Sequence, residues 1–215
     1  MMEQATQLQT EFHFGSTVVH ISEGNILAPP AAIRSSVQGL VSTDDNYVTM
    51  GSGVSKRLRE IGGAHYIRAA QRECPVDTGT IVVTKPYRLG QLFPSLQFVL
   101  HGTVINYDSE QRPLQEDVYR TTLNCVAKAR ELGLKSLLFP AFATGAGGID
   151  MESCAYAMCH ALKEHLAQEC PLESITVMLY RPTDAEQAAS YERRNAQFIK
   201  AANLQSKLTL DRQVP

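Results

Sequence analysis

The 215-residue sequence lacks several features that would assign its class at once. It has no tryptophan, and none of its apolar runs approaches the roughly 20 residues that are needed to span a bilayer. Its first residues, MMEQATQLQTEF, contain neither the basic segment nor the apolar core of a signal peptide. We therefore expect a soluble, cytoplasmic protein that has no membrane partner.

Cysteine is present in a number and spacing that argue against both disulfides and zinc. The five cysteines include no CxxC pair, and an odd set fits reduced thiols better than a disulfide framework. The cysteines and histidines between residues 154 and 170 recur at five-residue steps, which turn about 140° around a helix. Because zinc needs converging ligands, we expect no metal site.

An excess of basic charge is absent as well. The formal net charge of -2 provides no general attraction for nucleic acid, so we do not expect a nucleic-acid partner. Lys56, Arg57 and Arg59 are the one local basic cluster, and we interpret them as a solvated helix face. Any anion that the protein binds must therefore be bound by local groups.

Short apolar runs and helical patterns alternate along the chain. Strands are expected at 17–21, 39–42, 80–84, 97–101 and 175–180, and in the apolar run that begins at Leu137. This alternation predicts one α/β domain, in which helices cover both faces of a mixed, mostly parallel sheet. We expect the domain at residues 12–204, between an N-terminal extension (1–11) and a loose C-terminal tail (205–215).

Two glycine-rich loops each connect an expected strand to an expected helix. MGSGV occupies residues 50–54, and TGAGG occupies residues 144–148 after the run FPAFA. Successive backbone amides in such loops form a nest for phosphate oxygens, and the following helix adds its dipole. Neither loop matches the dinucleotide fingerprint GxGxxG or a P-loop. Ligands of α/β folds lie at the carboxyl ends of strands, where both loops are expected to meet.

The order and spacing of these segments resemble the macro domains, a family that binds ADP-ribose. EGNI (23–26) resembles the family's QGDI, GLVSTDDNYVTMGSGV (39–54) its AIVNAANxxLxxGGGV, GTIVVT (79–84) its GxAxxT, FVLH (98–101) its xIH, and FPAFATGAGG (139–148) its FPAISTGxxG. The resemblance covers roughly residues 18–180 and implies the three-layer α/β/α macro-domain fold. It also implies ADP-ribose, or an ADP-ribosylated protein or metabolite, as the partner, with no separate cofactor.

The resemblance further implies which residues bind the ligand. The two glycine loops would clamp the diphosphate and the distal ribose, and Tyr180 would stack on adenine unless it is a tyrosine at the edge of the core. The implied ligand-binding residues are Asn25, Ile26, Asp45, Gly51, Ser52, Gly53, Val54, Thr144, Gly145, Ala146, Gly147, Gly148 and Tyr180.

Two departures from the family pattern concern polar recognition. The aspartate that accepts a hydrogen bond from the adenine amino group is Asn25 here, and a carboxamide can both accept and donate. The second asparagine of NAAN is Asp45, which follows Asp44. A carboxylate at this position either orients water near the anomeric carbon or caps the backbone of the loop. Asp45, with Asp44 beside it, is therefore the candidate catalytic group.

Two further departures concern hydrolysis directly. The aspartate that follows GGGV in one hydrolytic branch is Ser55 here, and the aromatic residue of the second loop is Gly147. Asp150 either replaces the missing acid or caps the next helix, and we favour the cap. His101 is expected in a hydrogen-bond network at a strand end.

Three functions fit these residues. The first is a non-catalytic reader of ADP-ribose. The second is an enzyme that uses Asp45, either an ADP-ribosyl hydrolase or a deacetylase of an ADP-ribose derivative such as O-acetyl-ADP-ribose. The third is an interaction or RNA-binding module that keeps the fold but does not bind the nucleotide. The motifs carry no information on the oligomeric state.

Overall fold

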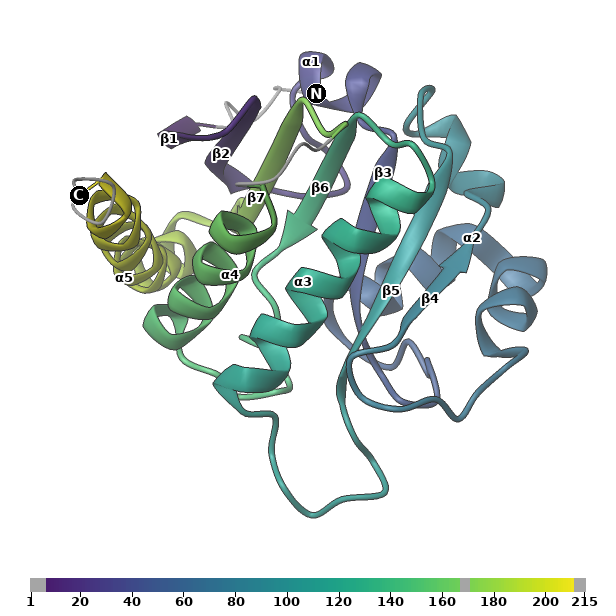
Figure 1. Ribbon diagram of the computed structural model, residues 1–215. Helices are drawn as coiled ribbons and strands as arrows, with labels where there is room; N and C mark the ends of the chain where they lie inside the picture. Colours follow the sequence, from purple (N-terminus) through teal and green to yellow (C-terminus); the bar gives the residue numbers. More distant parts are fainter. Residues whose placement is uncertain (1–6, 167–170, 211–215) are drawn as a thin grey trace.

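Strands of four to eight residues form one sheet in the computed structural model, which describes residues 7–166 and 171–210 (Figure 1). The seven strands lie in the order β1-β2-β7-β6-β3-β5-β4. Neighbours from β2 to β5 are parallel, whereas the edge strands β1 and β4 are antiparallel to β2 and β5. The mixed, mostly parallel sheet is thus confirmed. The strands are β1 (Gln7–Phe14), β2 (Thr17–Gly24), β3 (Gly39–Asp45), β4 (Ile81–Thr84), β5 (Phe98–Ile105), β6 (Ser136–Pro140) and β7 (Ser174–Tyr180).

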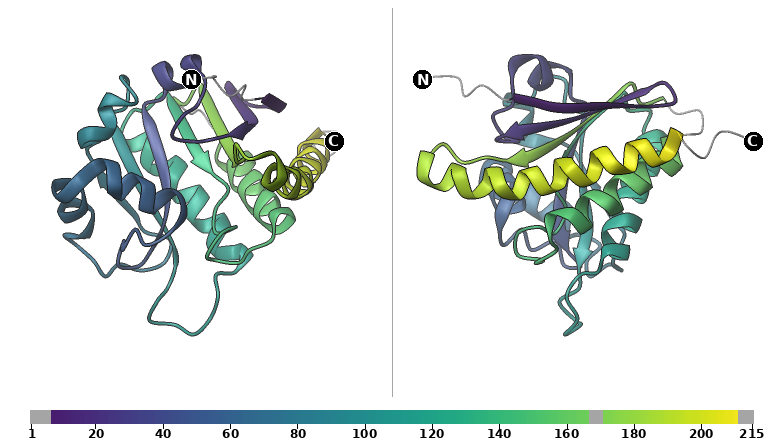
Figure 2. Two further views of the ribbon diagram at one scale, coloured as in Figure 1. Left: turned by 180° about the vertical axis from the view of Figure 1, so that it is seen from behind. Right: turned by 90° about the vertical axis from the view of Figure 1, so that its left-hand side faces the viewer.

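Helices cover both faces of this sheet, as Figures 1 and 2 show from opposite sides. They are α1 (Ala31–Ser36), α2 (Gly53–Gln71), the 3-10 helix η1 (Tyr87–Gln91), α3 (Gln115–Glu131), α4 (Met151–Leu166) and α5 (Ala185–Leu210). The helices α3, α4 and α5 pack on one face, and α1, α2 and η1 pack on the other. Within the described residues, none of the helices has the length and apolar character needed to cross a membrane.

The apolar core is divided by the sheet into two clusters. Successive side chains of a strand point to opposite faces. In β3, Leu40 therefore joins the cluster under α2, and Val41 joins the cluster under α3 and α4; both are fully buried. A central strand that is buried on both faces requires this continuous apolar run. The three-layer α/β/α fold follows from it.

The helix α2 is interrupted at a glycine. Gly63 has φ 76 and ψ -173, which interrupts the helix between its first and second segments. Residues with a side chain rarely adopt such a positive φ, whereas glycine does so at little cost. The first segment carries the glycine loop at its N-terminus, and the second places Tyr66 and Ala70 in the core.

The two ends of the described chain are more ordered than expected. Residues 7–11, which were expected in an N-terminal extension, form the first part of β1, because Phe12 and Phe14 are buried and anchor this edge strand. Residues 205–210, which were expected in a loose tail, continue α5, because no glycine or proline stops the helix before Leu210. Residues 1–6 and 211–215 lie outside the described chain.

The strand β3 is also longer than expected. The polar residues Thr43, Asp44 and Asp45 were expected to end the strand in a loop, but they continue the pairing with β5. Both carboxylates are almost fully buried and accept hydrogen bonds, which compensates for their polarity inside the sheet.

Candidate ligand-binding site

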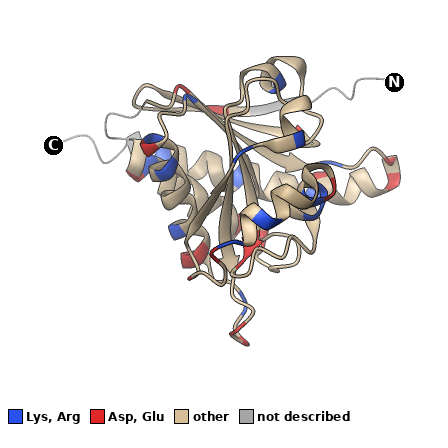
Figure 3. Ribbon diagram, turned by 90° about the vertical axis from the view of Figure 1, so that its right-hand side faces the viewer, with Lys and Arg blue, Asp and Glu red and all other residues tan. Residues whose placement is uncertain are grey.

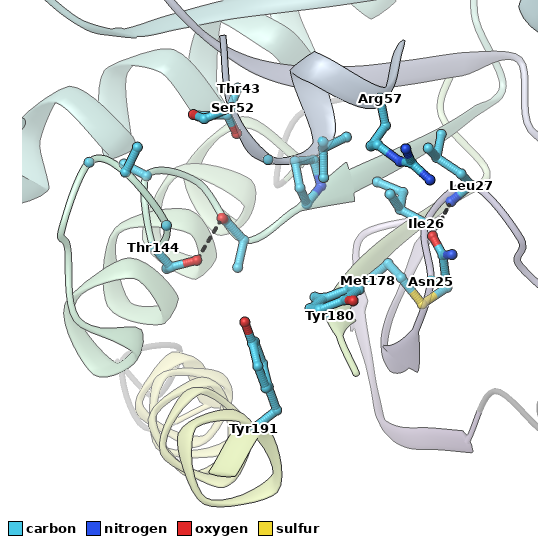
Figure 4. A pocket seen from close by; sticks show the side chains of 18 of the residues that line it. Asn25, Ile26, Leu27, Thr43, Ser52, Arg57, Thr144, Met178, Tyr180 and Tyr191 are labelled. Carbon is cyan, nitrogen blue, oxygen red and sulfur yellow. Dashed lines mark hydrogen bonds between the residues drawn. The ribbon is translucent and has the colours of Figure 1, made fainter. Parts of the chain in front are cut away.

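A cavity of about 780 Å³ lies at the carboxyl ends of the parallel strands (Figure 4). Each of these strands contributes a lining residue at or near its carboxyl end. These residues are Asn25 after β2, Thr43 in β3, Ile105 in β5, Pro140 in β6 and Tyr180 in β7. The first turn of α2, the loop after β6 and one face of α5 complete the wall. The cavity therefore lies where the order of strands and glycine loops places a ligand.

Most of the residues that were expected to bind the ligand line this cavity. They are Asn25, Ile26, Ser52, Gly53, Val54, Thr144, Gly145, Ala146, Gly147 and Tyr180. Among the described residues, the expected positions outside the lining are Asp44, Asp45, Gly51 and Gly148. The lining also includes polar residues that sequence reasoning did not assign to the site, namely Thr43, Arg57, Glu60, Tyr191, Arg194 and Asn195.

The first glycine loop presents hydroxyl groups as well as backbone amides. Ser52 occupies the N-cap position of α2, yet in the described chain its side chain makes no capping hydrogen bond. Gly53 has φ 55, a left-handed conformation that turns the backbone into the helix. The hydroxyl of Thr43 is buried and has no hydrogen-bond partner among the described residues. Buried hydroxyls are normally hydrogen-bonded, so Thr43 offers a free polar group at the cavity wall.

The second glycine loop is folded tightly onto itself. Gly148 N donates to Gly145 O at 3.1 Å, Ile149 N donates to Ala143 O at 3.1 Å, and Ala143 adopts φ 55. A Cβ atom on Gly147 would lie 2.7 Å from the carbonyl oxygen of Ala143, whereas one on Gly145 would meet no atom within 4 Å. Glycine is therefore required at position 147 for close packing of the backbone, and position 145 has free space.

Asp150 caps the helix that follows this loop. Its Oδ1 atom accepts a hydrogen bond from Ser153 N at 2.8 Å. This bond to the charged carboxylate lowers the pKa of Asp150. The interpretation of Asp150 as a helix cap is confirmed.

The carboxylate of Asp45 is bonded to its own loop. Asp45 Oδ1 accepts from Tyr47 N at 2.9 Å, and Oδ2 accepts from the Thr49 hydroxyl at 2.5 Å and from Thr49 N at 3.2 Å. The residue is only 4% exposed. Its oxygen atoms thus hold residues 45–49 in the turn that leads to the first glycine loop.

Asp44 lies at the centre of a buried polar network on the α2 side of the sheet. Its carboxylate accepts hydrogen bonds from the hydroxyls of Ser42, at 2.7 Å, and Ser55, and it pairs with His101 Nδ1 at 2.9 Å. The other ring nitrogen of His101 contacts the Thr84 hydroxyl at 3.3 Å. The network confirms the hydrogen bonds expected for His101, but the expected strand end is wrong, because β5 continues past His101 to Ile105. The network also joins the end of β3 to the first turn of α2.

Two tyrosines form one end of the cavity, as Figure 4 shows. Tyr180 is 50% exposed. The centre of its ring lies 5.2 Å from the centre of the Tyr191 ring, and the two ring planes make an angle of 84°. Nearby, Asn25 Oδ1 accepts a hydrogen bond from Leu27 N at 3.0 Å. The exposed face of Tyr180 can stack on a planar ring, but the Asn25 carbonyl is already engaged by the backbone.

The basic residues of α2 are exposed and mixed with acids. Arg57 Nη1 pairs with Glu60 Oε2 at 2.7 Å, and Arg59 Nη1 contacts Thr49 O at 3.3 Å. Figure 3 shows Lys and Arg interspersed with Asp and Glu over this side of the molecule. Arg57 differs from the expected solvated face in one respect, because it lines the cavity. In the part of the chain that the structure describes, which excludes Cys170, no cluster of three acidic, histidine or cysteine side chains is arranged to hold a metal ion.

The fold and the cavity together define a three-layer α/β/α domain with a cavity that is lined by residues of two glycine loops. The model of the Macro domain family matches residues 41–158, and the chain belongs to this family. The match contains both glycine loops, whereas β1, β2, β7 and α5 lie outside it.

Similar proteins support the same assignment. An uncharacterized protein of Sulfurisphaera tokodaii is 31% identical over 168 residues, which are 76% of this chain and 84% of that protein. A solved Oceanobacillus iheyensis macrodomain with ADP has a TM-score of 0.68 at 16% identity, and the match covers 89% of this chain and 96% of that one. A Trypanosoma brucei macrodomain in complex with ADP-ribose has a TM-score of 0.65 at 16% identity, covering 85% and 68%. These structural matches confirm the fold.

Proposed function

We propose that this macro domain binds ADP-ribose, either free or attached to a protein or a metabolite such as O-acetyl-ADP-ribose. The observation that carries the proposal is the cavity of about 780 Å³ that has glycine-loop backbone on its walls and an exposed tyrosine ring at one end. Its volume and its lining of both polar and apolar residues suit a dinucleotide-like ligand. The solved macrodomains that contain ADP or ADP-ribose support the choice of ligand.

The chemistry of the walls suits the parts of this ligand. A diphosphate carries about two negative charges, and hydrogen bonds to charged groups contribute about 1.5–3 kcal/mol each. Amides of residues 52–54 and 144–147 would supply such bonds, together with the hydroxyls of Ser52 and Thr43. The ring of Tyr180 would stack on adenine. The cytoplasmic location stays a prediction.

A non-catalytic reader is the form of this function that the site supports best. Asp45 and Asp44 are bonded to Thr49 and His101 and lie outside the cavity lining. Among the described lining residues, Glu60 is the only acid, and it is paired with Arg57. A water-activating carboxylate needs a free oxygen within reach of the anomeric carbon. Hydrolysis through a water near Asp45 stays a prediction with a separate test.

Calorimetry with ADP-ribose tests the binding proposal. The unmodified protein is expected to bind, and Gly145→Glu and Ser52→Glu are expected to abolish measurable binding, because each places a negative charge in the cavity. A side chain at position 145 would have room, since a Cβ atom there meets nothing within 4 Å.

Ala64→Glu is the matched control for this experiment. It adds the same charge at an exposed position of α2 outside the cavity lining, so it is expected to preserve binding. Absence of binding by the unmodified protein would refute the proposal, and so would undiminished binding by both loop variants.

Incubation with a mono-ADP-ribosylated protein and with O-acetyl-ADP-ribose distinguishes a reader from a hydrolase. We expect no enzymatic release of ADP-ribose, measured by chromatography. Asp45→Asn keeps an oxygen that can accept from Thr49 while it removes a base, and Asp77→Asn changes an exposed acid as a control. A different result would be release of ADP-ribose by the unmodified protein and by Asp77→Asn but not by Asp45→Asn. That result would establish a hydrolase that depends on Asp45.

A further inference from the structure

The C-terminal helix α5 lies outside the part of the chain that matches the family model, yet it forms one wall of the cavity. Figure 2 shows it along one side of the molecule, next to β1 and α4. Three of its residues, Tyr191, Arg194 and Asn195, line the cavity. The helix α5 therefore contributes side chains to the cavity wall from outside the residues that match the family model.

Specific contacts fix α5 against the ends of β7 and β6. Asn195, which is 1% exposed, donates from Nδ2 to Tyr180 O at 3.1 Å. Arg194 donates from Nη2 to Thr144 O at 2.8 Å, in the second glycine loop. Because these bonds join backbone atoms of two cavity walls to one helix, the side chains of α5 are held in a defined position beside the ligand space.

Arg194 carries a charge that none of the described carboxylates neutralises. Its guanidinium carbon lies 5.4 Å from the centre of the Tyr191 ring, and the residue is partly buried. Over residues 7–166 and 171–210, no carboxylate forms an ion pair with Arg194. The other arginine that lines the cavity, Arg57, differs in this respect, since it pairs with Glu60.

The chemistry of guanidinium indicates what completes this arrangement. The group has five N–H donors, and the carbonyl of Thr144 engages one nitrogen. An arginine that is held by a carbonyl and an aromatic ring, and that faces a cavity, is preorganised for a phosphate or another anion. Neither glycine loop contains a basic residue. Two arginines lie next to the second loop: Arg112, whose Nη1 atom would be 3.4 Å from a Cβ atom on Gly148, and Arg194, which of the two is the one that lines the cavity.

We propose that Arg194 binds the diphosphate of the ligand directly and that Tyr191 orients its guanidinium. The inference rests on the proposed function, because it assigns to Arg194 the binding of the charged part of the ligand in the same cavity. It makes α5 the element that discriminates between ligands that carry the diphosphate and neutral nucleosides. Tyr191, whose hydroxyl projects into the cavity in Figure 4, acts as a positioning residue.

The test compares Arg194→Gln with Arg193→Gln, using ADP-ribose and adenosine as ligands. Arg193 is the neighbouring arginine on α5, is exposed and lies outside the cavity lining. Arg193→Gln therefore removes the same charge from nearly the same position on the helix without changing the cavity wall. Arg194→Gln is expected to raise the Kd for ADP-ribose by about 10- to 100-fold, as for the loss of a charge-assisted hydrogen bond. The Kd for adenosine, from NMR titration, should change by less than about twofold because adenosine has no phosphate.

Salt dependence provides a second measurement. Raising the NaCl concentration should weaken ADP-ribose binding less in Arg194→Gln than in the unmodified protein, since the variant has lost the attraction that salt screens. Arg194→Lys keeps the charge and should retain most of the salt dependence.

Each outcome is decisive. Equal Kd values for ADP-ribose in Arg194→Gln and Arg193→Gln would overturn the role of Arg194 while leaving the proposed function intact. An equal loss of ADP-ribose and adenosine in Arg194→Gln would show that Arg194 only supports the loop, and it would also overturn the inference. Absence of ADP-ribose binding in the unmodified protein would overturn both proposals.

Discussion

Replacement of Gly147 by alanine is expected to raise the Kd for ADP-ribose by about 10- to 100-fold, measured by calorimetry. The added methyl carbon would lie 2.7 Å from both the carbonyl oxygen and the Cβ atom of Ala143. Neither atom belongs to a flexible side chain, so the clash is relieved only if the backbone of residues 143–147 moves. Because amides of these residues would hold the diphosphate, the movement removes several hydrogen bonds together.

Gly145→Ala provides a control within the same loop. A Cβ atom at position 145 has no neighbour within 4 Å, and the carbonyl of Gly145 can still accept from Gly148. This variant should bind ADP-ribose within about twofold of the unmodified protein, since no steric term opposes it. If Gly147→Ala bound equally well, the close packing of the loop would not determine the geometry of the site.

Asp44→Ala is expected to lower the free energy of unfolding by about 3–5 kcal/mol. The substitution leaves His101 Nδ1 and the hydroxyls of Ser42 and Ser55 without their buried acceptor. Each buried polar group that loses its partner retains its desolvation cost. Chemical denaturation followed by circular dichroism measures the effect.

The control for Asp44 is a second aspartate on the surface. Asp77 is exposed, so Asp77→Ala should change the free energy of unfolding by no more than about 0.5 kcal/mol. A loss of less than about 1 kcal/mol in Asp44→Ala would show that the network contributes little to stability, because an unsatisfied buried charge partner normally costs more.

The positions of the two glycine loops could be predicted because they follow from local signals and from the order of elements. Apolar runs place strands before residues 50–54 and 144–148, and parallel strands bring their carboxyl ends together. The cap at Asp150 was likewise local, since its partner Ser153 is three residues away. The edge strand β1 was missed, although Phe12 and Phe14 alternate with polar residues and provide a weak signal for a strand.

The parts of the site that could not be predicted depend on distant packing. Arg194 meets Thr144 across 50 residues, and nothing in either segment specifies how α5 crosses the second loop. The orientation of the Asp45 carboxylate could not be predicted for the same reason. Its residue type fits both a water-orienting group and a loop cap, and only the folded position of Thr49 shows which atoms it contacts.

The buried bonds around the first glycine loop determine how much order remains to be gained when a ligand binds. Asp44 ties Ser55, in the first turn of α2, to β3, and Asp45 ties Thr49 to the same strand. The backbone between these points therefore loses most of its conformational entropy during folding. Since ordering a residue costs about 1–2 kcal/mol, a loop that is already ordered leaves more of the interaction energy available as affinity. Asp44 and Asp45 thus favour binding through rigidity, at a distance from the ligand itself.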